Sequence, residues 1–237
     1  MLSNAYQIRR SARAKLVRIV VSIDKVEVVA PVRMPQQQIA QFVRSKQDWI
    51  TAAQANVRLK AAAIVRLSPS AYREGALIPY QGSHYVLTLN PTALKRIKVV
   101  FDSQFLVSIP TSLDSLNQEV AIKQALTAWM KQAVKVMIMH YVQLHSPRCQ
   151  LVPRMVRVKT QKSRWGSCSS NNDITINWLL ILAPPVILEY VVVHELCHIA
   201  VMNHSADFWQ LVAQHLPDYQ QHRHWLKQHG AGLMQGL

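Results

Sequence analysis

Residues 191–202 read VVVHELCHIAVM, an apolar run interrupted by His194, Glu195 and His198. On a helix the two histidines lie about 40° apart around the axis and one turn apart along it, so both imidazoles can reach one ion. Glu195 flanks the pair, at about 100° from His194. Because this helix is apolar nearly all round, we expect it to be buried, and buried imidazole and carboxylate groups need partners. A metal ion would supply them, and HExxH is a signature of zinc hydrolases; the alternative is a pair of histidines that only form hydrogen bonds in the core.

A catalytic zinc site has three protein ligands and a position open to water, so a third ligand must come from elsewhere in the chain. No Glu follows Glu195, whereas His204 lies six residues after His198, the spacing of the third histidine in HExxHxxGxxH enzymes. A continuous helix would rotate His204 about 240° away from His198, so the chain must turn first. We expect that turn at Asn203, in the left-handed conformation. We favour His204 over Asp207 as the third ligand. Asp207 is better suited to the first turn of a following helix, or to a contact with one of the ligands.

Patterns on either side of the motif predict the remaining elements. The prolines at 184 and 185 are tolerated in a first helical turn, so we expect the motif helix to run from there to residue 202. Ser205 can cap the next helix. Residues 154–160 and 173–178 are expected to pair as antiparallel strands around a turn-rich loop. Periodicity and turn signals predict a hairpin over 15–30, helices over about 36–63, 115–145 and 206–216, and a β-rich stretch over 77–110.

Length and composition limit the class of protein. The 237 residues suit one large domain or two small ones, and we divide them into a β-rich and helical N-terminal region, 1–110, and a domain with the motif, 111–237. Half of the residues are hydrophobic and 16% are charged, which excludes disordered and low-complexity chains. We find neither a secretory signal nor an apolar stretch that could span a membrane. Three widely spaced cysteines suit a reducing compartment, so we expect a cytoplasmic protein.

The charge is unevenly distributed along the chain. The whole chain has a net charge of +15, and residues 1–120 account for +9 of it, with 16 basic and 7 acidic residues. Residues 165–222, by contrast, contain five acidic residues and neither Lys nor Arg. A negative region around the motif favours a cation there, while the basic N-terminal half can hold an acidic partner or nucleic acid.

Several short motifs accompany HExxH: RWGSC at 164–168, NW at 177–178, APP at 183–185 and NHSxxFW at 203–209. With them the chain resembles, over most of its length, the YgjP-like metallopeptidase family, zincins related to SprT-like and WLM proteases. The resemblance implies an α+β fold with a zincin-like core, in which the HExxH helix lies beside a small, mainly antiparallel sheet. It also implies His194, His198 and His204 as zinc ligands, and Glu195 as general base.

We therefore expect a zinc-dependent peptidase. Zn²⁺ lowers the pKa of its water to about 7, and Glu195 can take the proton and pass it to the leaving amine. Strand 173–178 can align an extended peptide, and the candidate donors to the oxyanion are Arg164, Tyr190 and Tyr219. Two alternatives stay open: a metal-dependent hydrolase of phosphoanhydrides such as nucleotides, and a nucleic-acid-associated protein with structural zinc. Glu195 argues against the second, since a structural site needs no general base.

Overall fold

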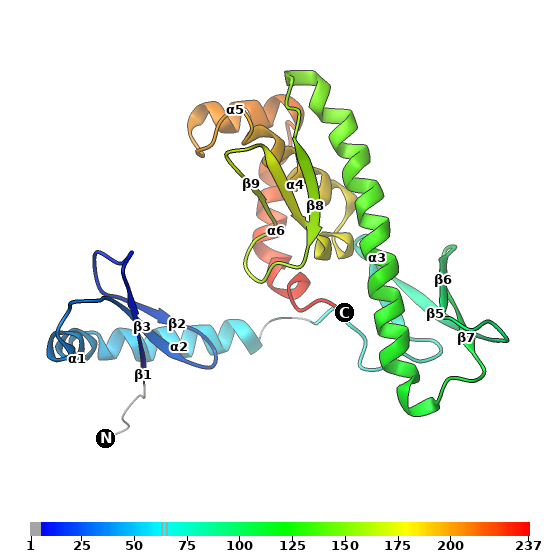
Figure 1. The fold of residues 1–237 in the computed structure, drawn as a ribbon, viewed down its shortest axis with the longest axis horizontal. Helices are drawn as coiled ribbons and strands as arrows, with labels where there is room; N and C mark the ends of the chain where they lie inside the picture. Colours follow the sequence, from blue (N-terminus) through cyan, green and yellow to red (C-terminus); the bar gives the residue numbers. More distant parts are fainter. Residues whose placement is uncertain (1–5, 63, 65) are drawn as a thin grey trace. The chain divides into compact units, whose positions relative to one another are not determined.

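The computed structural model describes residues 6–62, 64 and 66–237 (Figure 1). Contacts within the chain divide it into two compact units, Met1–Val65 and Arg66–Leu237. No helix in the described part of the chain is long and apolar enough to cross a membrane.

The first unit is a three-stranded sheet with two helices. Its elements are β1 (Tyr6–Ser11), β2 (Arg18–Val21), β3 (Val26–Pro31), α1 (Gln36–Ser45) and α2 (Gln47–Ala62). Strand β3 lies in the centre, antiparallel to β2 and parallel to β1, which confirms the hairpin predicted over 15–30. Alternate residues of β3 form a small apolar core with residues from both helices: Val26, Val28, Ala30, Ile39, Val43 and Ile50.

The second unit begins with a four-stranded sheet and a long helix. The strands are β4 (Leu77–Tyr80), β5 (Ser83–Thr92), β6 (Lys98–Phe101) and β7 (Phe105–Pro110), in the order β4-β5-β7-β6. Helix α3 (Ser115–His145) starts after Asp114, whose carboxylate accepts a hydrogen bond from the backbone of Leu116 at 3.2 Å, and it confirms the helix predicted there. Every fourth residue of α3 is buried: Ile122, Leu126, Met130, Val134, Ile138 and Val142. Figure 1 shows α3 in green, extending from strands β5–β7 to helix α4.

A second, smaller sheet precedes the motif helix. The short helix η1 (Ser146–Cys149) leads to β8 (Met155–Lys159), β9 (Gly166–Cys168) and β10 (Asp173–Asn177), in the order β8-β10-β9. The predicted antiparallel pairing of β8 with β10 is wrong, because these strands are parallel and the antiparallel partner of β10 is β9. A tight turn, with Asn172 at φ 58°, joins β9 to β10, so these two strands are antiparallel neighbours. The longer connection after β8 therefore leads past the position of β10 to β9, at the opposite edge of the sheet. The sheet is therefore mixed rather than mainly antiparallel.

The motif helix ends earlier than predicted. After η2 (Trp178–Leu182), α4 spans Pro185–Cys197, so the predicted start is correct. The chain leaves the helix through turns of the 3₁₀ type, in which the N–H groups of Ile199 and Ala200 bond to carbonyls three residues back. These turns need no left-handed residue, and Asn203 does not adopt that conformation. Its side chain instead accepts a hydrogen bond from the backbone of Ser205, directly before α5 (Ala206–His215) and α6 (Tyr219–Leu233).

One core joins the elements of the second unit. Buried residues of β4, β5 and β7 belong to the same apolar cluster as those of α3, β10, η2 and α4. The structure is a mixed α+β arrangement of six α-helices and three small sheets in its described residues, in agreement with the predicted α+β class. The assignment of domains to 1–110 and 111–237 stays a prediction.

The tip of the β4–β5 hairpin supports the start of the motif helix. Gln81 and Gly82 form the turn with positive φ values of 50° and 80°, the geometry of a tight hairpin turn. Their backbone N–H groups donate to the carbonyls of Ile181 and Leu182 at 2.8 and 3.0 Å. A Cβ atom on Gly82 would lie 2.8 Å from a ring carbon of Pro184, so the turn requires glycine for its conformation and for its close packing.

We predict that Gly82→Ala destabilises the protein more than Gly75→Ala. Both glycines have φ near 80°, which costs an alanine about 1–2 kcal/mol, but a Cβ on Gly75 meets nothing within 4 Å. At Gly82 the contact with Pro184 adds about 1–3 kcal/mol of overpacking. Urea unfolding of the two variants measures the difference, and equal losses would show that the hairpin tip does not press on Pro184.

Candidate metal centre

Helix α4 presents the HExxH side chains from its last turn. His194 and Glu195 lie within the helix, and His198 is its C-cap residue. The helix is buried on nearly every side, which places Glu195 and His198 in the core with exposed fractions of only 5% and 8%. The Nδ1 atom of His198 lies 3.0 Å from the carbonyl oxygen of Val201, a hydrogen bond that leaves Nε2 as the lone-pair nitrogen. The early end of α4 therefore also orients the second histidine.

The turn after α4 brings His204 back to the helix. One ring nitrogen from each of His194, His198 and His204 lies within 4.8 Å of the others, and the Nε2 atoms of His194 and His204 are 3.1 Å apart. All three histidines singled out in the sequence thus meet at one point. Asp207 lies in the first turn of α5 and is not in this group of described residues.

This donor set fits a zinc ion. Nitrogen ligands about 2.05 Å from a tetrahedral zinc lie about 3.3 Å apart, close to the separation of His194 from His204. Burial, and to a smaller extent the neighbouring His198 and His204, lowers the pKa of His194 to about 3. Burial also lowers the pKa of His198. Both rings are neutral near pH 7, the form in which imidazole binds a metal.

Aromatic side chains of α5 and α6 hold the histidine rings. Phe208 stacks on His198 with ring centres 4.4 Å apart, and Trp209 stacks on His204 at 5.6 Å. Trp209 also contacts His194, with ring centres 5.8 Å apart, Tyr219, stacked at 5.3 Å, and the guanidinium of Arg223, at 4.5 Å from the ring centre. His204 comes from an exposed loop, so this stack limits the positions that its ring can take.

Glu195 lies against strand β9. A Cβ atom on Gly166 would come within 2.6 Å of the Glu195 Cγ, so only glycine leaves room for this carboxyl. Burial raises the pKa of Glu195 to about 8, against the opposing effect of Arg164. A carboxyl with a pKa near neutrality can both accept and return a proton. Cys197, the other central residue of the motif, is fully buried in the apolar core.

The sequence did not single out two residues around the histidines. Trp209 is the last residue of the motif at 203–209, and Arg223 lies one residue beyond the window that lacks basic residues. The stacking of Trp209 and Arg223 depends on how α5 and α6 pack against each other. The spacing of residues along either helix could not predict it. Of the three candidate oxyanion donors, Tyr190 packs edge-on against His194 at 5.9 Å, Tyr219 lies behind Trp209, and Arg164 precedes β9.

Three histidines around one point, with a buried carboxyl beside them, could hold a divalent metal ion through their ring nitrogens. Comparison with protein families gives the same class, since a family model described as "YgjP-like, metallopeptidase domain" matches residues 15–229. The chain therefore belongs to the YgjP-like metallopeptidase family. This membership supports a metal-dependent peptidase, a class of hydrolase that acts on peptides or proteins with a divalent metal. No curated protein matches the chain.

We predict that Trp209→Ala weakens metal binding, because His204 loses the ring that stacks on it. Groups that orient a metal-binding histidine typically contribute about 10–100-fold to affinity. Calorimetric titration of zinc into chelator-treated protein measures the loss. Trp225→Ala is the matched control, since Trp225 stacks on His229 in α6 and not on a histidine of this group. An equal loss of zinc affinity in both variants would contradict the role of Trp209.

Proposed function

We propose that the protein is a zinc-dependent peptidase with a zincin-like core, in which His194, His198 and His204 bind zinc and Glu195 is the general base. The convergence of three imidazole nitrogens within 4.8 Å is the observation that carries the proposal. The neutral form of the His194 and His198 rings supports it, as does the position of Glu195 next to His194 on α4.

A bound zinc ion would supply a Lewis acid and lower the pKa of its water to about 7. The residues of the chain provide the proton transfers and the orientation. Glu195 would accept a proton from the attacking water and return it to the leaving amine. The contact with Gly166 keeps its carboxyl on one side of the histidines. Packing around Phe208 and Trp209 keeps the ligand rings in place between turnovers.

Strand β9 is better placed than β10 to align a peptide. We expected residues 173–178 to do so, but β10 is paired on both edges, with β8 and with β9, and has no free edge. β9 ends the sheet on the side of α4, and Gly166 contacts Glu195 there. An extended peptide added to this edge would form main-chain hydrogen bonds and pass next to the general base.

The two other functions considered from the sequence stay predictions. A phosphoanhydride hydrolase would use the same histidines and Glu195, with Arg164 and Arg223 as the nearby cations. A protein with purely structural zinc would have no use for a buried carboxyl beside three ligands.

We predict that Glu195→Gln retains zinc but loses hydrolysis. The amide keeps the shape of the side chain but cannot accept the proton, so turnover falls by at least about 100-fold. The assay follows casein and a nucleoside triphosphate with wild-type protein, with the variant and with chelator. Full activity of the variant would refute the general base, and chelator-sensitive hydrolysis of the triphosphate without proteolysis would favour the phosphohydrolase.

A second variant tests the position of the carboxyl rather than its chemistry. Gly166→Ala places a methyl group where the Glu195 side chain lies, so we expect peptidase activity to fall about 10–100-fold through misalignment. Zinc affinity should be nearly unchanged, since no histidine moves. Gly75→Ala, a substitution into open space, is the control. Unchanged activity in Gly166→Ala would show that this contact does not position the base.

A further inference from the structure

A basic groove lies between α3 and the edge strand β8, and it shares no residue with the metal centre. It forms a pocket of about 480 Å³ whose lining includes four cations, Lys131 and Lys135 from α3 and Arg157 and Lys159 from β8. Lys131 and Lys135 are one helical turn apart, about 6 Å along the axis, and Arg157 and Lys159 are about 6.6 Å apart along the strand. Two lysines thus project from α3, and two further cations project from β8, on the face of that strand opposite to Val156.

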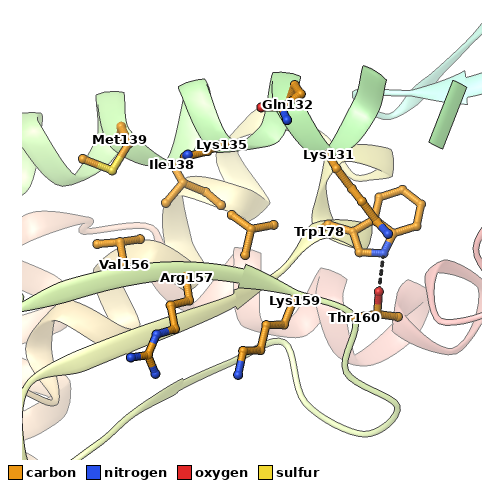
Figure 2. Close-up of a pocket in the computed structure, with 11 residues that line it drawn as sticks. Lys131, Gln132, Lys135, Ile138, Met139, Val156, Arg157, Lys159, Thr160 and Trp178 are labelled. Carbon is orange, nitrogen blue, oxygen red and sulfur yellow. Dashed lines mark hydrogen bonds between the residues drawn. The ribbon is translucent and has the colours of Figure 1, made fainter. Parts of the chain in front are cut away.

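The cations border an apolar floor. Figure 2 shows Ile138 and Val156 facing each other between α3 and β8, while Arg157 and Lys159 project from the other side of the strand. Lys131 extends across the groove to the ring of Trp178, 5.4 Å from its centre. Strand β8 is at the edge of its sheet, so its outer backbone N–H groups have no strand partner among the described residues. A chain laid along this edge would contact backbone donors and have cations on both sides.

Most of this charge is not neutralised by the protein. Lys131, Lys135 and Lys159 form no ion pair in the described part of the chain. Arg157 lies 3.6 Å from Asp173, a carboxylate that also pairs with Arg154 at 2.6 Å. The sequence around the groove is free of acids: residues 120–172 contain nine Lys and Arg and neither Asp nor Glu. Such a segregation of charge creates a positive potential that attracts a polyanion.

We propose that this groove binds the phosphate backbone of a single-stranded nucleic acid, without reading its sequence. A nucleic acid carries a negative charge on every unit, which matches cations repeated along α3 and along the edge strand β8, whereas a peptide would need acidic residues at matching intervals. Phosphate oxygens accept hydrogen bonds from Lys, Arg and backbone N–H groups, and the apolar floor accommodates sugar and base.

The same groove lacks the means to read bases. Trp178, the aromatic residue in its lining, is only 5% exposed, is covered by Lys131 and donates a hydrogen bond to Thr160 at 3.0 Å. It therefore offers no open face for stacking. This proposal does not depend on the peptidase activity, and it concerns a different surface from the basic N-terminal half, whose acidic partner stays a prediction.

The test measures binding of a fluorescent oligothymidylate of about 16 nucleotides to the full chain by anisotropy, over a range of salt concentrations. The variant replaces Lys131, Lys135, Arg157 and Lys159 with Gln. Each phosphate contact contributes about 0.7 to the slope of log affinity against log salt for a single strand, so the slope should fall by about 2–3. At low salt the affinity should fall at least about tenfold.

Matched variants separate this site from general surface charge. Replacing Lys95, Arg96, Lys98 and Lys227, four exposed cations outside the groove, with Gln removes the same charge and should preserve most of the binding. Changing the three lysines of the groove to Arg keeps the charge and should preserve the affinity, which guards against misfolding as an explanation. Equal losses in the two Gln variants, unchanged binding in the groove variant, or equally effective competition by polyglutamate would overturn the proposal.

Discussion

The close contact between β9 and α4 determines the geometry of the candidate centre. Gly166 has no side chain, and the carboxyl of Glu195 fills the space that a Cβ would occupy. Asn177, fully buried at the end of β10, holds the approach to β9 by donating hydrogen bonds to the carbonyls of Gln161 and Arg164, at 2.8 and 3.1 Å. The carboxyl of Glu195 is thus located by a sheet as well as by its own helix, because sheet and helix meet at a position where no larger residue fits.

Local patterns could be predicted from the sequence, and long-range pairings could not. The prolines before α4 and the periodicity over 115–145 each concern a single helix, so the predicted start of α4 and the predicted helix α3 are confirmed. The spacing of His194, His198 and His204 sufficed to single out the residues that meet. The order of β8, β9 and β10 in the sheet depends on the path of the connection between β8 and β9. Neither the pattern of apolar residues along a strand nor the turn residues determine that path. The stack of Trp209 on His204 likewise depends on how α5 packs, which no periodicity encodes.

The acidic residues near the motif in sequence are not all available to a cation. Asp173 pairs with Arg154 at 2.6 Å, and Glu189 pairs with His145 at 2.8 Å. The negative window seen in the sequence is therefore partly neutralised in the fold. Beside the three histidines lies the buried carboxyl of Glu195, while Arg164 acts on Glu195 and Arg223 acts on His194, so cations as well as carboxylates contribute to the electrostatic environment of the centre.

The hairpin that supports α4 limits where the chain can be shortened. The N–H groups of Gln81 and Gly82 satisfy the carbonyls of Ile181 and Leu182, in a stretch where every residue is buried. A fragment that starts after residue 110 would leave these two acceptors without their donors, at a cost of about 1–3 kcal/mol for each one that water does not reach. Truncation at that point would also uncover Pro184 and the apolar start of α4. We therefore expect β4 and β5 to contribute to the stability of any piece that retains the histidines.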